Sequence, residues 1–225
     1  IKAIEHYAVL LRENPSLIEN PYEVVQAFFE AGKGEELVSL LTEIAPKAKI
    51  SAIVSMLLWA TAEECSRRDM LIEAEKLLKA MIKLFPDRDT LYISLADLYR
   101  RRGETGKATK LIEDRLEKVR TSSAQRRINL IEKLIDLYEA EGKLDELLAR
   151  YEAELESDPD DPALNYITAL ISIRMGRIGK AEIAVKRLMS SRSSEAWRLL
   201  NGIAQRYIRY SYPLEAVRIY RWKLE

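Results

Sequence analysis

The side chains that most often carry catalysis or bind metals are scarce in this sequence. It contains one cysteine, Cys65, and one histidine, His6. A single thiol cannot form an intrachain disulfide or a cysteine metal cluster, and a single imidazole cannot supply a two-histidine zinc motif. Cys65 continues an apolar helix stripe, so we expect a small buried hydrophobe there, and we expect His6 at a surface or interface. The sequence therefore predicts no catalytic residues, no metal site and no cofactor.

Carboxylates are plentiful, but their spacing favours solvated helix faces over acid–base chemistry. Asp and Glu together number 36, as do Lys and Arg, and the acidic residues recur opposite the apolar stripes. We therefore expect a chain that is not an enzyme.

Because nucleic-acid affinity rests mainly on phosphate neutralisation, the zero net charge also argues against a nucleic-acid partner. The most apolar stretch, Ile50 to Ala62, is shorter than the roughly 20 residues of a membrane span, which predicts no membrane insertion by this segment.

The segment 128–159 shows the elements from which the chain is built. Two apolar stripes at helical spacing are separated by Gly142, where positive φ can close the first helix, and Asp158-Pro159 ends the second. Neither helix can bury its stripe alone, so the two are expected to pair and to stack on neighbouring pairs. The residues of the two stripes are Ile131, Leu134, Ile135 and Tyr138, then Leu147, Leu148, Tyr151 and Leu155.

This pattern recurs along the chain and resembles the tetratricopeptide repeat, a family of helix–turn–helix units about 34 residues long. Six copies follow a leading half-repeat at residues 1–15, so the sequence is expected to begin inside an array. The copies span residues 18–49, 55–86, 89–120, 128–159, 162–193 and 197–225. The resemblance implies an all-α fold, a right-handed α-solenoid of tandem repeats over residues 1–225.

Three local features predict irregularities within the array. Asp69 and Ser211 stand where the other units have glycine, and we expect a less tight turn at Asp69. Residues 121–125 are linker-like and could form a hinge or cap the next helix, which gives possible sub-blocks 1–120 and 121–225. The first helix of the fifth unit is off-pattern, with polar residues at usually apolar positions: Asn165, Thr168 and Ser172.

The eighth and twentieth positions of each unit, where its two helices should meet, divide the repeats into two kinds. Four units have facing alanines, which allow close approach: Ala62/Ala74, Ala96/Ala108, Ala169/Ala181 and Ala204/Ala216. The first and fourth have Val25/Leu37 and Ile135/Leu147, which hold helices further apart. The array is therefore predicted to be two blocks of three, each opened by a looser unit.

The resemblance implies that partners bind on the inner face lined by the first helix of each unit, at residues one turn apart. The predicted groove residues are Tyr22, Gln26, Trp59, Glu63, Asp97, Glu132, Asp136, Tyr166, Asn201 and Gln205. The middle of this row is acidic, and its aromatics could anchor a partner side chain. The alternative is that the aromatics pack against the neighbouring first helix. The basic residues of the family's chaperone-tail clamp are missing, so that mode is not expected.

Arginines gather near the ends of the first helices and form a predicted basic rim at Arg67, Arg100 and Arg101. The favoured interpretation is that they compensate helix C-termini, each contributing about 0.3–1 kcal/mol. The alternative is a surface for acidic partners.

Two functions follow from these expectations. The first is a non-catalytic interaction scaffold that binds a protein or peptide segment, with a basic segment suited to the acidic groove. The second is a structural spacer or self-association segment of a larger assembly or secretion protein, acting through open ends that carry Tyr220 and Trp222. RNA binding by a related helical-repeat design is disfavoured by the charge balance. The compartment is not indicated.

Overall fold

A computed structural model describes residues 2–46, 51–119, 124–191 and 194–224 of the chain. The chain divides into two compact units, unit 1 at residues 1–115 and unit 2 at residues 116–225. All regular structure in the described residues is helical, which confirms the predicted all-α class. No described helix is both long and apolar enough to cross a bilayer.

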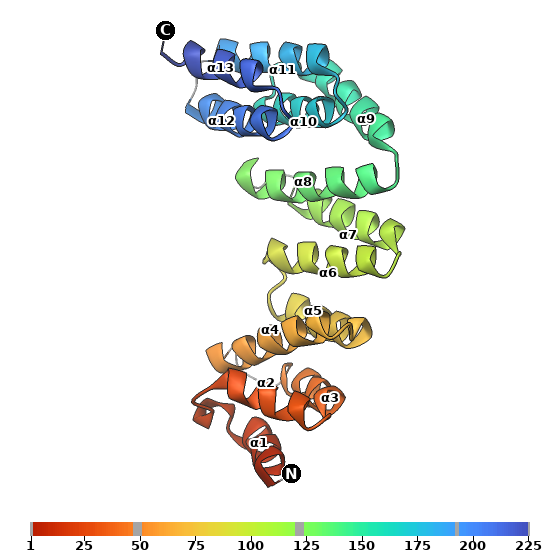
Figure 1. Ribbon diagram of the computed structural model, residues 1–225, viewed down its shortest axis with the longest axis vertical. Coiled ribbons are helices and arrows are strands. Elements are labelled where there is room, and N and C mark those ends of the chain that lie inside the picture. Colours follow the sequence, from red (N-terminus) through yellow and green to blue (C-terminus); the bar gives the residue numbers. More distant parts are fainter. Residues whose placement is uncertain (1, 47–50, 120–123, 192–193, 225) are drawn as a thin grey trace. The chain divides into compact units, whose positions relative to one another are not determined.

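Unit 1 contains a leading helix and consecutive helical hairpins (Figure 1). Helix α1 packs on α2 and α3, and each later first helix packs on the second helix before it. The elements are α1 (Lys2–Glu13), the short 3₁₀ helix η1 (Pro15–Leu17), α2 (Pro21–Glu30), α3 (Gly34–Ile44), α4 (Ala52–Arg67), α5 (Leu71–Leu84), α6 (Asp89–Arg101) and α7 (Thr105–Lys118). Helix α4 begins three residues before residue 55, the predicted start of the second repeat, and the repeat bounds stay a prediction.

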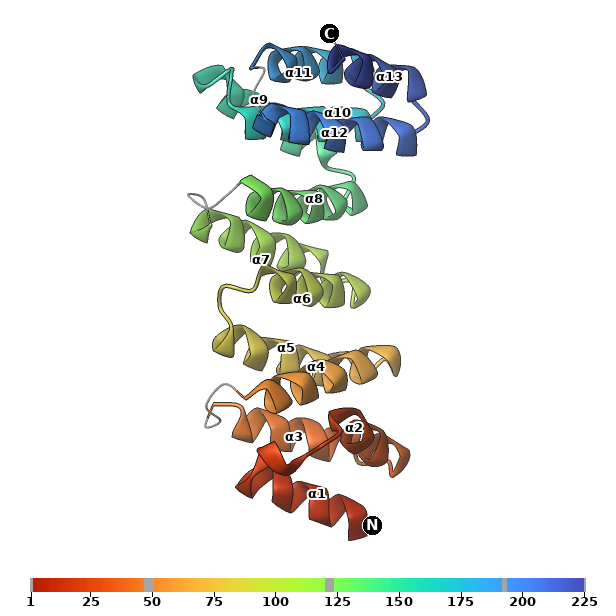
Figure 2. The ribbon, with the colours of Figure 1, turned by 90° about the vertical axis from the view of Figure 1, so that its left-hand side faces the viewer.

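Unit 2 contains three further hairpins (Figure 2). Its helices are α8 (Ala124–Ala140), α9 (Leu144–Ser157), α10 (Pro162–Arg174), α11 (Ile178–Ser191), α12 (Ser194–Arg209) and α13 (Pro213–Trp222). Helix α8 begins within the predicted linker 121–125, whose first three residues lie outside the described part of the chain. The division between units falls inside α7, a few residues before the expected boundary at 120/121.

One backbone turn closes the first helix of every hairpin. The N–H three residues after the last residue of the helix donates to a carbonyl five residues back, at 2.7–2.9 Å, and the residue just before the donor has positive φ. The six bonds run from Lys33 to Phe28, Met70 to Cys65, Glu104 to Tyr99, Lys143 to Tyr138, Arg177 to Ser172 and Tyr212 to Tyr207. The positive-φ residue is glycine in four turns, but Asp69 (φ 61°) and Ser211 (φ 67°) in the others.

The turn at Asp69 keeps one hydrogen bond of the glycine-containing turns unchanged, but its second bond is longer, in line with the expected less tight turn. The Met70 N–H to Cys65 O distance is 2.8 Å, the same as in the glycine-containing turn at Gly142. The second bond, from the Asp69 N–H to the Ser66 carbonyl, is 3.4 Å, against 3.0 Å for the equivalent bond at Gly142. The missing glycine therefore loosens this part of the turn and adds backbone strain of about 1 kcal/mol.

The positions predicted to lie between paired helices are buried in both units. All eight facing alanines are buried, as are Val25, Leu37, Ile135 and Leu147. The core of each hairpin is therefore formed at the residues that the repeat register predicts. Cys65 is buried too, as expected.

Helix α10 is the central helix of unit 2. It packs on α8, α9, α11 and α12, so even its polar residues Asn165, Thr168 and Ser172 are buried. Asn165 Nδ2 donates to the carbonyls of Pro159 (2.8 Å) and Asp161 (2.9 Å), which fixes the chain entering α10. The off-pattern asparagine thus secures the start of the helix.

Candidate binding groove

The first helices of unit 1 line two adjoining clefts. The larger, about 540 Å³, lies between α4 and α6 and reaches Ala74 and Leu78 of α5 at its base. The smaller, about 490 Å³, lies between α2 and α4. Glu63 and Arg67 line both clefts, so the two form one surface, here called the unit 1 groove.

The five groove residues predicted in this part of the chain all line it: Tyr22, Gln26, Trp59, Glu63 and Asp97. The two aromatics are exposed, Tyr22 by 58% and Trp59 by 41%. The alternative is that the aromatics pack against a neighbouring first helix. These two side chains are not buried in that way, and much of each stays accessible to a partner. The amide of Gln26 donates to Glu30 at 2.7 Å.

The groove carboxylates differ in how they are neutralised. Glu63 makes no ion pair or side-chain hydrogen bond with any residue that the structure describes. Asp97 lies 3.7 Å from Arg100 on the same helix. Glu64 receives hydrogen bonds from Arg67 (2.6 Å) and Arg68 (2.5 Å), and the bond from Arg67 is the main reason that its pKa falls to about 2. Glu63, at the junction of the two clefts, is thus left for an outside cation.

The arginines of the predicted basic rim are engaged by the chain itself. Arg67 is held by Glu64, and Arg101 donates to the hydroxyl (2.6 Å) and the carbonyl (3.1 Å) of Ser66 and to Asp69 at 3.1 Å. The carbonyl of Ser66 belongs to the last turn of α4, so Arg101 compensates a helix C-terminus of the preceding repeat. These contacts support the favoured interpretation of the rim.

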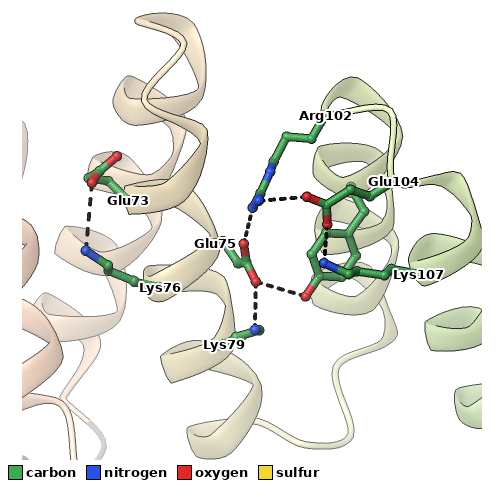
Figure 3. Close-up of polar contacts among 8 residues, drawn as sticks. Glu73, Glu75, Lys76, Lys79, Arg102, Glu104 and Lys107 are labelled. Atoms are coloured by element: carbon green, nitrogen blue, oxygen red, sulfur yellow. Dashed lines mark hydrogen bonds and ion pairs between the residues drawn. The ribbon is translucent and has the colours of Figure 1, made fainter.

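A network of part-buried charges joins α6 to α5 (Figure 3). Glu75 accepts hydrogen bonds from Tyr99 (3.0 Å) and Arg102, and it pairs with Lys79 at 2.7 Å. Burial raises the pKa of Glu75, but the bonds from Lys79 and Tyr99 outweigh burial and leave the pKa lowered. Arg102 also pairs with Glu104 at 2.7 Å, which links the network to the start of α7. The network thus links α5, α6 and the start of α7 by side-chain contacts.

In unit 2 the equivalent acidic residues are neutralised internally. Glu132 on α8 pairs with Arg206 of α12 at 2.5 Å and accepts a hydrogen bond from the Tyr166 hydroxyl at 3.3 Å. Asp136 pairs with Arg174, whose guanidinium also lies 3.0 Å from Glu139. These contacts leave a space of only about 10 Å³ among α8, α10 and α12. The predicted acidic stretch therefore does not continue as open acidic surface here.

Tyr166 is a correction to the predicted groove. It is only 5% exposed, and burial raises the pKa of its hydroxyl to about 12. Its ring fits against Gly202 of α12, where an added Cβ would meet the tyrosine at 3.0–3.6 Å. The packing alternative thus holds for Tyr166, because a glycine in the next first helix makes room for the ring.

The remaining predicted residues of unit 2 lie on α12. Asn201 is half-buried and accepts a hydrogen bond from the Tyr220 hydroxyl at 3.4 Å, and Gln205 is exposed. Sequence reasoning missed Arg206, which fills the inner face. It occupies the tenth position of its repeat, outside the two positions per helix from which the groove was predicted.

Comparisons with known proteins give a fold likeness only. No family model matches the sequence, and no curated protein matches it. The chain is similar to several solved tetratricopeptide-repeat structures. One is TTC0263 from Thermus thermophilus, with 17% identity over 87% of this chain and 98% of that chain and a TM-score of 0.41. A tetratricopeptide repeat protein from Parabacteroides merdae has 19% identity over 72% and 75%, with a TM-score of 0.38. MamA has 16% identity over 72% and 92%, with a TM-score of 0.35.

Proposed function

We propose that the chain is a non-catalytic interaction scaffold whose unit 1 groove binds a segment of a protein partner. The observation that carries the proposal is the exposed ring of Trp59 beside Glu63, whose carboxylate pairs with none of the described residues, in a cleft of about 540 Å³. Exposed aromatics in a preformed cleft are frequent binding anchors, and a carboxylate without a partner favours a cation. The expected ligand is therefore a segment with lysine or arginine next to an apolar residue.

Capture of partners from a native extract tests this function. Trp59→Ala should weaken capture by at least about 2 kcal/mol, as expected for a central aromatic anchor. Ile72→Ala is a matched control, since Ile72 is also exposed and apolar in unit 1 but lies on α5 and lines neither cleft. Equal capture by the wild-type and Trp59 variants would refute groove binding.

A second function, self-association or spacing, is favoured by exposed apolar residues on α13. Leu214 and Val217 are exposed one turn apart, and Trp222 stacks on Trp197 with ring centroids 6.3 Å apart. A second copy or an adjoining assembly component could cover this face. Leu214→Lys should then lower the solution mass at high concentration and leave partner capture through the groove unchanged. If the mass is that of a monomer at all concentrations, self-association through this face is excluded.

A further inference from the structure

We infer that the cleft between α4 and α6 is a subsite for one arginine side chain of the partner, bound between the Trp59 ring and the Glu63 carboxylate. The inference rests on the proposed function of the groove and names the ligand chemistry of that site.

The cleft combines apolar and charged surfaces that are complementary to a long cationic side chain. Its inner walls are apolar, from Ala62, Ala74, Leu78 and Leu98. Glu63 stands one turn beyond Trp59 on α4, so the carboxylate and the ring face the same opening. An aliphatic stem can bury against the apolar walls while its charged head stays at the rim. The head then meets a carboxylate and an aromatic face together.

Unit 2 shows how an arginine is held at the corresponding carboxylate. Glu63 and Asp136 are both the ninth residue of their repeats. Asp136 is paired with Arg174 from the next first helix, and that guanidinium also contacts Glu139 and lies 5.8 Å from the Tyr210 ring centroid. The chain thus binds a guanidinium by carboxylate and aromatic contacts at this register position.

The arginine at the equivalent position of unit 1 binds other residues instead of the ninth-position carboxylate. Arg101 has the thirteenth position of its repeat, as Arg174 has in unit 2, but it is bound to Ser66 and Asp69 at the end of α4. Arg67 is bound to Glu64. Neither neutralises Glu63, so the ninth-position carboxylate remains available to a guanidinium from outside.

The site favours arginine over lysine. A guanidinium is planar, so it can stack on the Trp59 indole while its edge donates to Glu63. The ammonium of lysine is a strongly hydrated point charge, which loses more hydration on entering a cleft with apolar walls. Citrulline has the same shape as arginine without the charge and separates stacking from ion pairing.

Heteronuclear NMR titration with N-acetyl-arginine N-methylamide tests the inference. The expected result is saturable shifts of the Trp59 indole and of α4 and α6 amides, with a Kd on the order of millimolar. The lysine and citrulline counterparts should bind at least about threefold more weakly. Glu63→Gln should weaken the arginine probe by about 3–5-fold, the equivalent of one exposed ion pair. Glu35→Gln, an exposed carboxylate of α3 outside the groove, should have no effect.

The outcomes separate this inference from the proposed function. Equal affinity for the arginine and lysine probes, or full binding by Glu63→Gln, would overturn the arginine subsite. Shifts at α8 or α12 instead of α4 would also overturn it. If partner capture still depends on Trp59 in that case, the groove function stands and only its arginine chemistry fails. Loss of Trp59 dependence in capture would remove the groove function itself.

Discussion

The inner faces of the two units have similar sequence patterns, but they differ in whether the chain itself neutralises their carboxylates. In unit 1 the first helices leave two clefts and an exposed tryptophan, and Glu63 has no ion-pair partner within the described part of the chain. In unit 2 Arg174, Arg206 and Tyr166 occupy the same face and neutralise its carboxylates. An acidic residue on an inner face therefore indicates a binding surface only when the next first helices do not supply its counter-charge.

Of the substitutions that compare the two units, those between paired helices should change the free energy of unfolding the most. Leu147→Ala removes a buried side chain opposite Ile135 in unit 2 and should lower the free energy of unfolding by about 2–5 kcal/mol. Ala108→Leu adds volume opposite Ala96 in unit 1 and should cost about 1–3 kcal/mol. Urea unfolding of both variants measures the difference. A neutral Ala108→Leu would show that the helices of the third repeat are not closely packed at this pair.

Removing one carboxylate from each inner face tests the electrostatic difference directly. Glu132→Gln weakens the contacts to Arg206 and Tyr166, and it should destabilise unit 2 by about 1–2 kcal/mol. Glu63→Gln loses no internal partner, so the free energy of unfolding should change by no more than about 0.5 kcal/mol. Thermal unfolding followed by circular dichroism compares them. Equal losses in the two variants would contradict the assignment of one face as internally neutralised.

The two turns without glycine should respond differently to the same substitution. Ser211→Gly relieves positive-φ strain and should stabilise the fold by about 1 kcal/mol. Asp69→Gly relieves similar strain but removes the carboxylate that pairs with Arg101 at 3.1 Å, so its gain should be smaller. The melting temperatures of the two variants rank them. A larger gain for Asp69→Gly would show that this ion pair contributes nothing.

The smallest expected effect concerns pH at the groove rim. Hydrogen bonds from Arg67 and then Arg68 hold the pKa of Glu64 at about 2, below the ordinary value of a glutamate. Because the folded pKa is lowered, this contribution to stability is present above about pH 4.5 and is lost as the pH falls towards 2. NMR titration of the Glu64 side chain measures the pKa, and Arg67→Ala should raise it. An unchanged pKa in that variant would contradict the pairing.

The sequence allowed the fold to be predicted because repeat spacing constrains backbone and core together. Helix ends near Gly142 and Pro159, and the burial of Ala96 and Ala108, follow from local propensity and a register that six copies reinforce. The residues predicted for the groove in unit 1 line the two clefts for the same reason, and their role in binding stays a prediction. Side-chain pairing across repeats could not, because the Arg206–Glu132 contact joins residues 74 positions apart and depends on rotamers of long flexible side chains. Tyr166 was misplaced because the room that Gly202 provides lies in a different repeat.

The contact between Arg206 and Glu132 has a mechanical consequence. It connects α8 to α12, which are two repeats apart, while α10 packs between them. Pulling α8 away from α12 must break this charged pair as well as the two helix interfaces with α10. Under tension, unit 2 should therefore resist stretching until one rupture force is reached and then yield in a single step. An Arg206→Ala variant should extend gradually at lower force, as an array joined only by neighbouring repeats would.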